Sequence, residues 1–150
     1  MKVAINTKFG GFRLSPLAVL EIAKRKGKEC FFFSHDYKTD KFTQLSLGEA
    51  MDEIMFHAFS VSNPQDYNLS TPDEDGLYHS ANARSEKISI SSSDYDRSDP
   101  DLIAVIEELK DAANTEYSKL KIVEIPDGTN FVIEEYDGNE HIAEAHKEWY

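Results

Sequence analysis

The chain has little of several features that would classify it at once. Its 150 residues include a single cysteine, Cys30, so no disulfide can form within the chain. No apolar run approaches the roughly 18 residues of a membrane span, and residues 1–5 lead directly into polar residues without the apolar segment of a signal peptide. We therefore expect a cytoplasmic protein that does not insert into membranes.

The sequence patterns of familiar enzymes are also absent. Neither a GxxxxGK[ST] phosphate loop, a GxGxxG dinucleotide loop nor a GxSxG nucleophile elbow occurs. Cys30 lies in an apolar run without a neighbouring base, so we interpret it as a small buried side chain. His141 and His146 lack the i, i+4 spacing of a zinc-binding helix. We expect neither a metal nor a cofactor.

Basic residues are few relative to acidic ones. The 28 acids and 16 bases give a formal net charge of −12, which repels phosphate backbones. We therefore expect no direct binding to nucleic acid. Two interpretations of the acidity remain: a solvated surface that keeps the protein soluble, or an acidic face that occupies the nucleic-acid site of an enzyme.

Length and hydrophobic content are sufficient for one packed core. A chain of 150 residues with 40% hydrophobic residues, including nine Phe and seven Tyr, can bury a core without metal or disulfide links. We expect a single compact domain over residues 1–150, with an exposed loop at 63–83, where Asn-Pro, Thr-Pro and an acidic stretch ending in glycine occur.

The first third of the chain reads as strand, loop, helix and strand. Residues 2–6 form a short apolar strand, and Ser15 caps a helix that starts at Pro16 and ends before Gly27. Residues 30–34 are apolar without interruption, which is typical of a buried strand. A parallel β-α-β crossover within a mixed sheet is the simplest arrangement.

The middle of the chain is less regular. Residues 35–43 carry mixed charges and predict a loop, and the apolar spacing from Leu47 to Ile54 predicts a helix. Residues 55–61 then favour a strand. The alternation of apolar and polar residues at 87–91 predicts a half-buried strand.

The final third begins with the most regular helix. Ser98 or Asp99 caps it, Pro100 takes its first position, and the apolar residues recur with helical spacing as far as Ala113. Strands at 119–125 and 130–136 flank Pro-Asp-Gly, which predicts a hairpin.

Ile142, Ala145 and Trp149 are spaced as on a helix, which predicts a short closing helix. The sequence thus predicts an α+β fold, with a mixed β-sheet, two main helices and a C-terminal β-hairpin followed by that helix.

The loop between the first strand and the first helix is a candidate anion site. Paired glycines let backbone N–H groups approach a ligand near a helix start, and Arg13 would add positive charge. Arg97 lies at a second turn before a helix, where its planar donors suit an anion. The candidate ligand-binding residues are Asn6, Thr7, Gly10, Gly11, Arg13 and Arg97. The alternatives are plain turn chemistry for the glycines and, for Arg97, a structural ion pair with Asp94, Asp96 or Asp99.

A second cluster follows the predicted hairpin. Tyr136, Asp137, His141 and Trp149 combine phenol, carboxylate, imidazole and indole groups. On a strand, Glu135 and Asp137 share one face, so an acid–base site with His141 is one interpretation. The other is a partly buried aromatic cluster, which includes His146, with solvated acids around it.

Three stretches carry a resemblance to a known family. They are residues 5–12 (INTKFGGF), residues 97–100 (RSDP) and residues 119–150, which include KIVEIPDG and IEEYDGNEHIAEAHKEW. In these motifs the chain resembles a family of small uncharacterised proteins encoded by tailed bacteriophages and prophages. The chain departs from the relatives at Lys110, where they tend to have glycine, and at Asn130 and His141, where aromatic residues are frequent.

The resemblance implies an accessory protein that antagonises host defence. Together with the candidate anion site, it favours sequestration of a small anionic, nucleotide-derived ligand. One alternative is an acidic inhibitor of a host defence protein such as a nuclease, acting through residues 94–99 and 134–140. Another is a phosphodiesterase-like enzyme that uses His141. The abundance of aromatic residues leaves a homo-oligomer open.

Overall fold

The structure is a computed structural model that describes residues 1–64 and 88–145. Helices and strands are both present, which confirms the predicted α+β class. The chain divides into two compact units, Met1–Ala18 with Tyr95–Tyr150, and Val19–Asp94. The assignment of all 150 residues to one domain stays a prediction, and the predicted loop at 63–83 lies outside the described residues from 65 onward.

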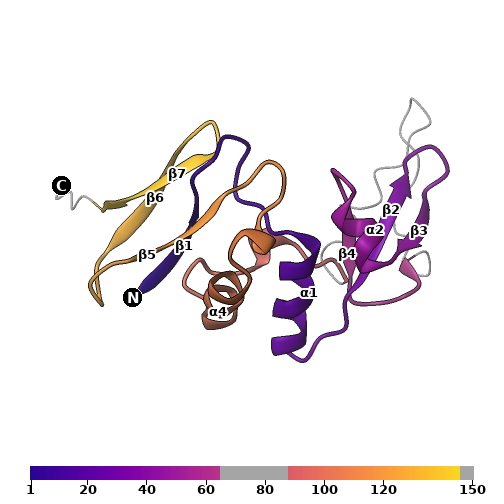
Figure 1. The fold of residues 1–150 in the computed structure, drawn as a ribbon, viewed down its shortest axis with the longest axis horizontal. Coiled ribbons are helices and arrows are strands. Elements are labelled where there is room, and N and C mark those ends of the chain that lie inside the picture. The colour runs from indigo at the N-terminus through magenta and orange to yellow at the C-terminus, as the bar shows by residue number, and fades with distance from the viewer. Residues whose placement is uncertain (65–87, 146–150) are drawn as a thin grey trace, which may run out of the picture. The chain divides into compact units, whose positions relative to one another are not determined.

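The first unit is built on the pairing of strands β1 (Lys2–Asn6) and β5 (Leu120–Glu124), which run antiparallel (Figure 1). Lys2 lies opposite Glu124, and Asn6 lies opposite Leu120. Every residue of β1 after Lys2 is buried. Residues 3–5 of this strand are apolar without alternation because β1 contacts helix α4 in addition to the strands beside it.

Helix α4 (Pro100–Leu109) begins as the sequence predicts. The Asp99 carboxylate accepts hydrogen bonds from the backbone N–H groups of Asp101 and Leu102, and Pro100 takes the first helical position. The buried face consists of Leu102, Ile103, Val105 and Ile106. The helix ends earlier than predicted, because Lys110 adopts a positive φ of 53° and residues Lys110–Ala113 form a 3₁₀ turn, η3.

The hairpin of this unit is formed by β6 (Phe131–Tyr136) and β7 (Asn139–Glu144). Asp137 and Gly138 both have positive φ, 51° and 88°, as a two-residue type I′ turn requires. The hairpin predicted around residues 126–128 is wrong, since β5 pairs with β1 instead.

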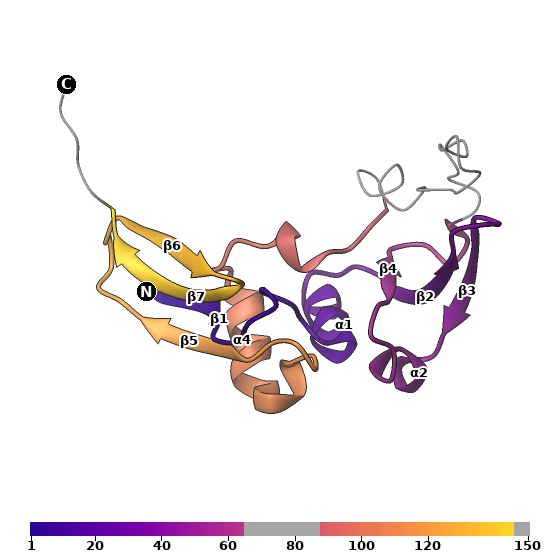
Figure 2. The same cartoon turned by 90° about the horizontal axis from the view of Figure 1, so that it is seen from above.

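The C-terminal hairpin therefore lies one strand further along the chain than the sequence suggests. Ile142 belongs to β7, so the predicted closing helix does not include it, and Trp149 lies outside the described residues. Strand β7 contacts β1, and Figure 2 shows β6 on the side of β7 away from β1.

The second unit has its own antiparallel sheet, in the order β3-β2-β4. Its strands are β2 (Phe31–Asp36), β3 (Lys41–Leu45) and β4 (His57–Phe59). The predicted loop at 35–43 is wrong, because β2 and β3 form a hairpin there. The predicted parallel crossover is also wrong: β1 and β2 pair in different sheets, and all strand pairings among the described residues are antiparallel.

Aromatic side chains fill the core of this unit. Phe33, Phe42 and Phe59 pack with Ile88, the first residue after the undescribed segment. Of the residues predicted as a strand at 87–91, the described ones, 88–91, contribute a single bridge, between Ser89 and Phe59.

Three short helical elements complete the description. Helix α1 (Pro16–Arg25) starts at Ser15, whose hydroxyl accepts the N–H of Ala18, as predicted. Helix α2 (Leu47–Met51) carries a reciprocal capping box between Ser46 and Glu49. A 3₁₀ turn, η2 (Ser92–Asp94), precedes the return to the first unit.

Candidate functional site

Arg97 and Glu140 form a two-bonded ion pair in the first unit. The two guanidinium NH₂ nitrogens of Arg97 donate to the two carboxylate oxygens of Glu140 at 2.7 and 2.9 Å. The Glu140 side chain is only 7% exposed, and that of Arg97 is 24% exposed. A planar guanidinium matches a carboxylate in this parallel geometry, which gives a stronger interaction than a single contact.

The same pair holds the end of β1. Arg97 also donates to the carbonyl of Ala4 at 3.2 Å, and Glu140 accepts the backbone N–H of Asn6 at 2.8 Å. The guanidinium carbon lies 3.7 Å from the centre of the Phe12 ring, within the range of a cation–π interaction. Arg97 is thus held by a carboxylate, a carbonyl and an aromatic face at once.

Asn6 links three separate segments. Its fully buried side chain donates to the carbonyls of Lys8 at 2.6 Å and Gly138 at 2.7 Å. Its amide oxygen accepts the backbone N–H of Lys119 at 2.9 Å. The neighbouring Thr7 donates both its N–H and its hydroxyl to the Lys119 carbonyl. The polar groups that sequence reasoning offered to a ligand are therefore used to join β1, β5 and the β6–β7 turn.

Gly138 allows the β6–β7 turn to come very close to the paired glycines. The N–H of Gly10 donates to the carbonyl of Asp137 at 3.1 Å, and a Cβ atom on Gly138 would lie 2.2 Å from the nitrogen of Gly11. Only glycine fits such a close approach of two backbones. Gly10 and Gly11 thus lie against this turn, and both interpretations of them, ligand binding and plain turn chemistry, stay predictions.

The structure brings most of the predicted ligand-binding residues together. Asn6, Thr7, Gly10, Gly11 and Arg97 lie around the same junction, joined by Glu140, Gly138 and Phe12, which sequence reasoning did not assign to the site. The side chain of Arg13 is exposed, and its carbonyl accepts the hydroxyl of Ser118.

The acidic partner of Arg97 is not one of those expected. Asp94 accepts the N–H of Ser91, Asp96 accepts from Ser98, and Asp99 caps α4. A signal for Glu140 was present in the sequence: it shares one face of its strand with Ile142, and a carboxylate on an apolar face needs a cation.

The described members of the predicted cluster after the hairpin, Tyr136, Asp137 and His141, are exposed. Tyr136 is 79% exposed, and its ring meets the ring of Phe9 edge to face, with centroids 6.3 Å apart. His141 pairs with Glu134 at 3.0 Å and not with Glu135 or Asp137, and both side chains of that pair are exposed. Trp149 and His146 lie outside the described residues.

These exposed groups define one surface, which we call the turn patch. On β6, Val132, Glu134 and Tyr136 alternate onto the same face, and His141 lies opposite Glu134. Phe9 reaches this face from the first loop and is 56% exposed. The turn patch consists of Phe9, Val132, Glu134, Tyr136 and His141.

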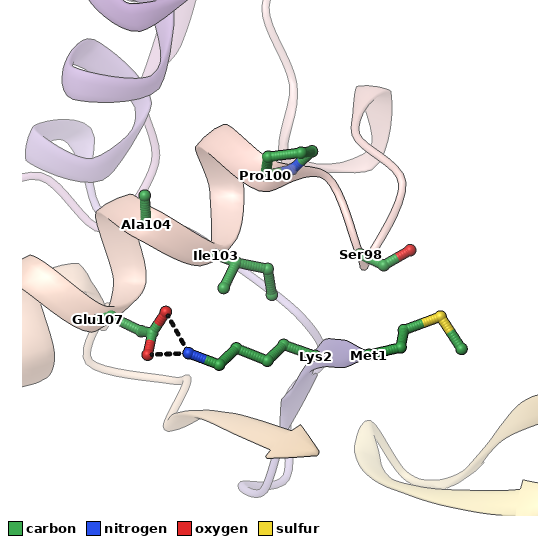
Figure 3. A pocket seen from close by; sticks show the side chains of 7 residues that line it. All are labelled: Met1, Lys2, Ser98, Pro100, Ile103, Ala104 and Glu107. Carbon is green, nitrogen blue, oxygen red and sulfur yellow. Dashed lines mark hydrogen bonds and ion pairs between the residues drawn. The ribbon is translucent and has the colours of Figure 1, made fainter. Parts of the chain in front are cut away.

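A groove lies elsewhere in the first unit, between α4 and the start of β1 (Figure 3). Its volume is about 440 Å³, and it is lined largely by Pro100, Ile103 and Ala104 of the helix. Lys2 extends along it and is held by Glu107 at 2.9 Å, so the cation of the groove is already neutralised.

The second unit contains an ionisable pair that sequence reasoning did not single out. The His35 ring and the Asp40 carboxylate lie 2.9 Å apart, with side chains 0% and 4% exposed. The ring of His57 lies beside that of His35, with centroids 5.6 Å apart. Burial, and secondly the nearby His35, lower the pKa of His57 below its ordinary value.

Comparisons with protein-family models, with curated proteins and with solved structures found no match to this chain. None of the helices formed by residues 1–64 and 88–145 combines the length and hydrophobicity needed to cross a lipid bilayer. Within the same residues, no three or more His, Cys, Asp or Glu side chains are grouped so as to hold a metal ion.

Proposed function

We propose that this chain is a phage-type accessory protein that binds a basic surface of a host protein through the turn patch. The observation that supports this most directly is the exposed aromatic pair of Phe9 and Tyr136 on an acidic hairpin. Large exposed aromatic groups are enriched at the centres of protein interfaces, where they contribute much of the binding energy.

The aromatic pair is poorly explained by folding alone. Tyr136 is 79% exposed, so its ring buries little area against Phe9. An exposed pair of this kind loses more water when a partner covers it than it does when the chain folds. The turn patch therefore has apolar area available for a partner.

The charges around the pair specify the kind of partner. Glu134, Glu135 and Asp137 are all exposed on or next to β6, and the chain as a whole carries a formal charge of −12. Such a surface attracts a lysine- or arginine-rich face and accelerates its association at low salt. A nucleic-acid-binding host enzyme, such as a nuclease, presents a face of this kind.

Sequestration of a small anion has less support from the contacts. The guanidinium of Arg97 already meets a carboxylate, and the N–H of Gly10 is bonded to Asp137. A phosphate at this junction would have to displace Glu140, a nearly buried acid. The anion hypothesis stays a prediction, and calorimetry with a panel of nucleotides and cyclic nucleotide signals tests it.

A catalytic role for His141 also stays a prediction. Its partner Glu134 lies beside it on an exposed strand face, where water screens the interaction. Turnover of a nucleotide by the wild-type protein, lost in His141→Ala, would favour an enzyme over a binding protein.

Site-specific cross-linking tests the protein-binding proposal. A photoreactive phenylalanine analogue at position 136 should cross-link one host protein from lysate, and the yield should fall steeply between low and high salt. The same analogue at position 54 provides a matched control, because Ile54 is also a well exposed apolar residue, 67% exposed, but lies in the other unit.

Two features of the result test the proposal: the position of the photoreactive residue that captures the protein, and the charge of the captured protein. Tyr136→Ala should reduce its affinity by more than about tenfold, which is about 1.4 kcal/mol, while Ile54→Ala leaves it unchanged. Equal cross-linking from positions 136 and 54, or capture of an acidic protein that does not respond to salt, would contradict the proposal.

A further inference from the structure

Strand β6 is an edge strand on the side away from β7. Among the described residues it pairs with β7 alone, and β7 in turn contacts β1, so the outer side of β6 is not covered by another described strand (Figure 2). An edge strand presents unpaired N–H and C=O groups that can accept a further strand. This edge borders the turn patch, since Tyr136 and Glu134 belong to it.

The turn fixes which backbone groups point outward. In a two-residue hairpin, the residues that flank the turn, here Tyr136 and Asn139, exchange hydrogen bonds. At the other end of the hairpin, the N–H of Ala145 donates to the carbonyl of Asn130. Asn130 lies six residues before Tyr136, an even number, so both residues direct their backbone groups toward β7. The alternation of an antiparallel ladder therefore directs the N–H and C=O groups of Phe131, Ile133 and Glu135 away from β7.

The charge on the edge selects the strand that can join it. Glu134 and Glu135 are adjacent and exposed, and Glu144 lies opposite Phe131 on β7. A second copy of β6 placed on this edge would bring like charges together, which is unfavourable and protects the edge against self-association. Because Glu134 and Glu135 point to opposite faces, an extended segment that alternates lysine or arginine with apolar residues would place its cations beside Glu135 and its apolar residues on the face of Tyr136.

We infer that the partner supplies a basic extended segment that adds to β6 as a further antiparallel or parallel strand. This inference rests on the proposed function, because it specifies how a basic partner engages the turn patch. Backbone hydrogen bonds to Phe131, Ile133 and Glu135 hold the segment, and its cations meet Glu135 on the face away from the turn patch. The Phe9–Tyr136 pair packs against the apolar side chains of the segment.

A short capped peptide of alternating valine and lysine is the probe, used with the full chain at low salt. Amide hydrogen exchange by NMR should show about tenfold slower exchange at Phe131, Ile133 and Glu135 when the peptide binds, and little change at Val132 and Glu134, whose N–H groups face β7. The same peptide with alternate N-methyl groups keeps its charge but lacks the N–H groups of one edge, and it should bind at least about fivefold more weakly.

A matched pair of variants tests the edge by changing the protein instead of the peptide. Glu135→Pro removes an outward N–H and a charge, whereas Glu135→Thr removes the charge alone and keeps the N–H. The proline variant should bind the peptide about tenfold more weakly than the threonine variant. If Glu135→Pro lowers the melting temperature, its weaker binding does not test the edge. The binding of plain and N-methylated peptides to the wild-type protein then tests strand addition instead.

The outcomes separate this inference from the proposed function. Equal binding of the plain and N-methylated peptides, or no slowing of exchange at the three outward amides, would overturn strand addition. If Tyr136→Ala still abolishes capture of the host protein, the proposed function stands without it. Slowed exchange at the outward amides, together with cross-linking that does not depend on position 136, would support strand addition and contradict the turn patch as the host-protein site.

Discussion

The Arg97 guanidinium and the Glu140 carboxylate meet in two hydrogen bonds, although 43 residues separate them in the chain. The pair joins the turn before α4 to strand β7, and through Asn6 it also holds the end of β1. These contacts lie where residues 5–12, 97–100 and 119–145 converge. The stretches are thus close in space because they build one junction of the fold.

Removing Arg97 should destabilise the protein substantially. Arg97→Ala leaves Glu140 nearly buried without its cation, which we expect to lower the free energy of unfolding by about 2–4 kcal/mol. Arg97→Lys should recover less than half of the loss, because lysine cannot make the two-bonded contact. Urea denaturation followed by circular dichroism measures both.

Lys2→Ala serves as the control for the Arg97 variants. It breaks the ion pair with Glu107, in which both side chains are more than 40% exposed, and should change the free energy of unfolding far less than Arg97→Ala does. If Arg97→Ala were as mild as Lys2→Ala, the Arg97–Glu140 pair would not be a structural link, and anion binding by Arg97 would become the better interpretation.

Gly138→Ala should be far more damaging than Gly128→Ala. Both glycines have positive φ, 88° and 77°, so the backbone strain of alanine is similar at about 1 kcal/mol. A Cβ atom at position 138 would also lie 2.2 Å from the nitrogen of Gly11, whereas nothing lies within 4 Å at position 128. We expect a loss of at least about 3 kcal/mol for Gly138→Ala. Equal melting temperatures for the two variants would show that the turn does not approach the glycine loop.

The elements that the sequence predicted well are those with local signals. Helix α4 has Asp99, Pro100 and a regular apolar face, and α1 has Ser15 and Gly27 at its ends. Each of these signals acts within a few residues, so a single sequence contains it in full. The Asp137-Gly138 turn carries an equally local signal, but the sequence prediction places the hairpin turn at Asp127-Gly128 instead.

The incorrect hairpin and the missed partner of Arg97 depend on contacts between distant segments. Residues 119–125 look like half of a hairpin with 130–136, but β5 instead pairs with β1, which lies more than a hundred residues earlier. The partner of Arg97 was sought among the nearest acids for the same reason. A register or an ion pair between distant segments leaves no local pattern, and sequence reasoning recovered only part of the site.

The second unit should become less stable as the pH falls below about 6.5. Burial and the neighbouring His35 lower the pKa of His57, so the unfolded chain binds a proton more readily than the folded one. The second unit therefore keeps its full stability above the ordinary histidine pKa, and its free energy of unfolding decreases as the pH falls below that value. The groups near His57 are His35, which pairs with Asp40, and the rings of Phe42 and Phe59.

His57→Phe keeps an aromatic ring at that position and removes the titration. The free energy of unfolding, measured by denaturation between pH 5.5 and 7.5, should therefore depend less on pH in His57→Phe than in the wild type. Parallel curves for the wild type and His57→Phe would exclude His57 as the source.

Lys110 has a backbone conformation that favours glycine. Its φ of 53° and ψ of −124° belong to a region that L side chains rarely adopt. Lys110→Gly should relieve this strain and raise the free energy of unfolding by about 1 kcal/mol, despite the greater freedom of glycine in the unfolded chain. Lys110→Ala removes the same charge and keeps the strain, so it should give no gain. Thermal denaturation of the three proteins compares them, and a glycine variant no more stable than the alanine variant would show that position 110 is unstrained.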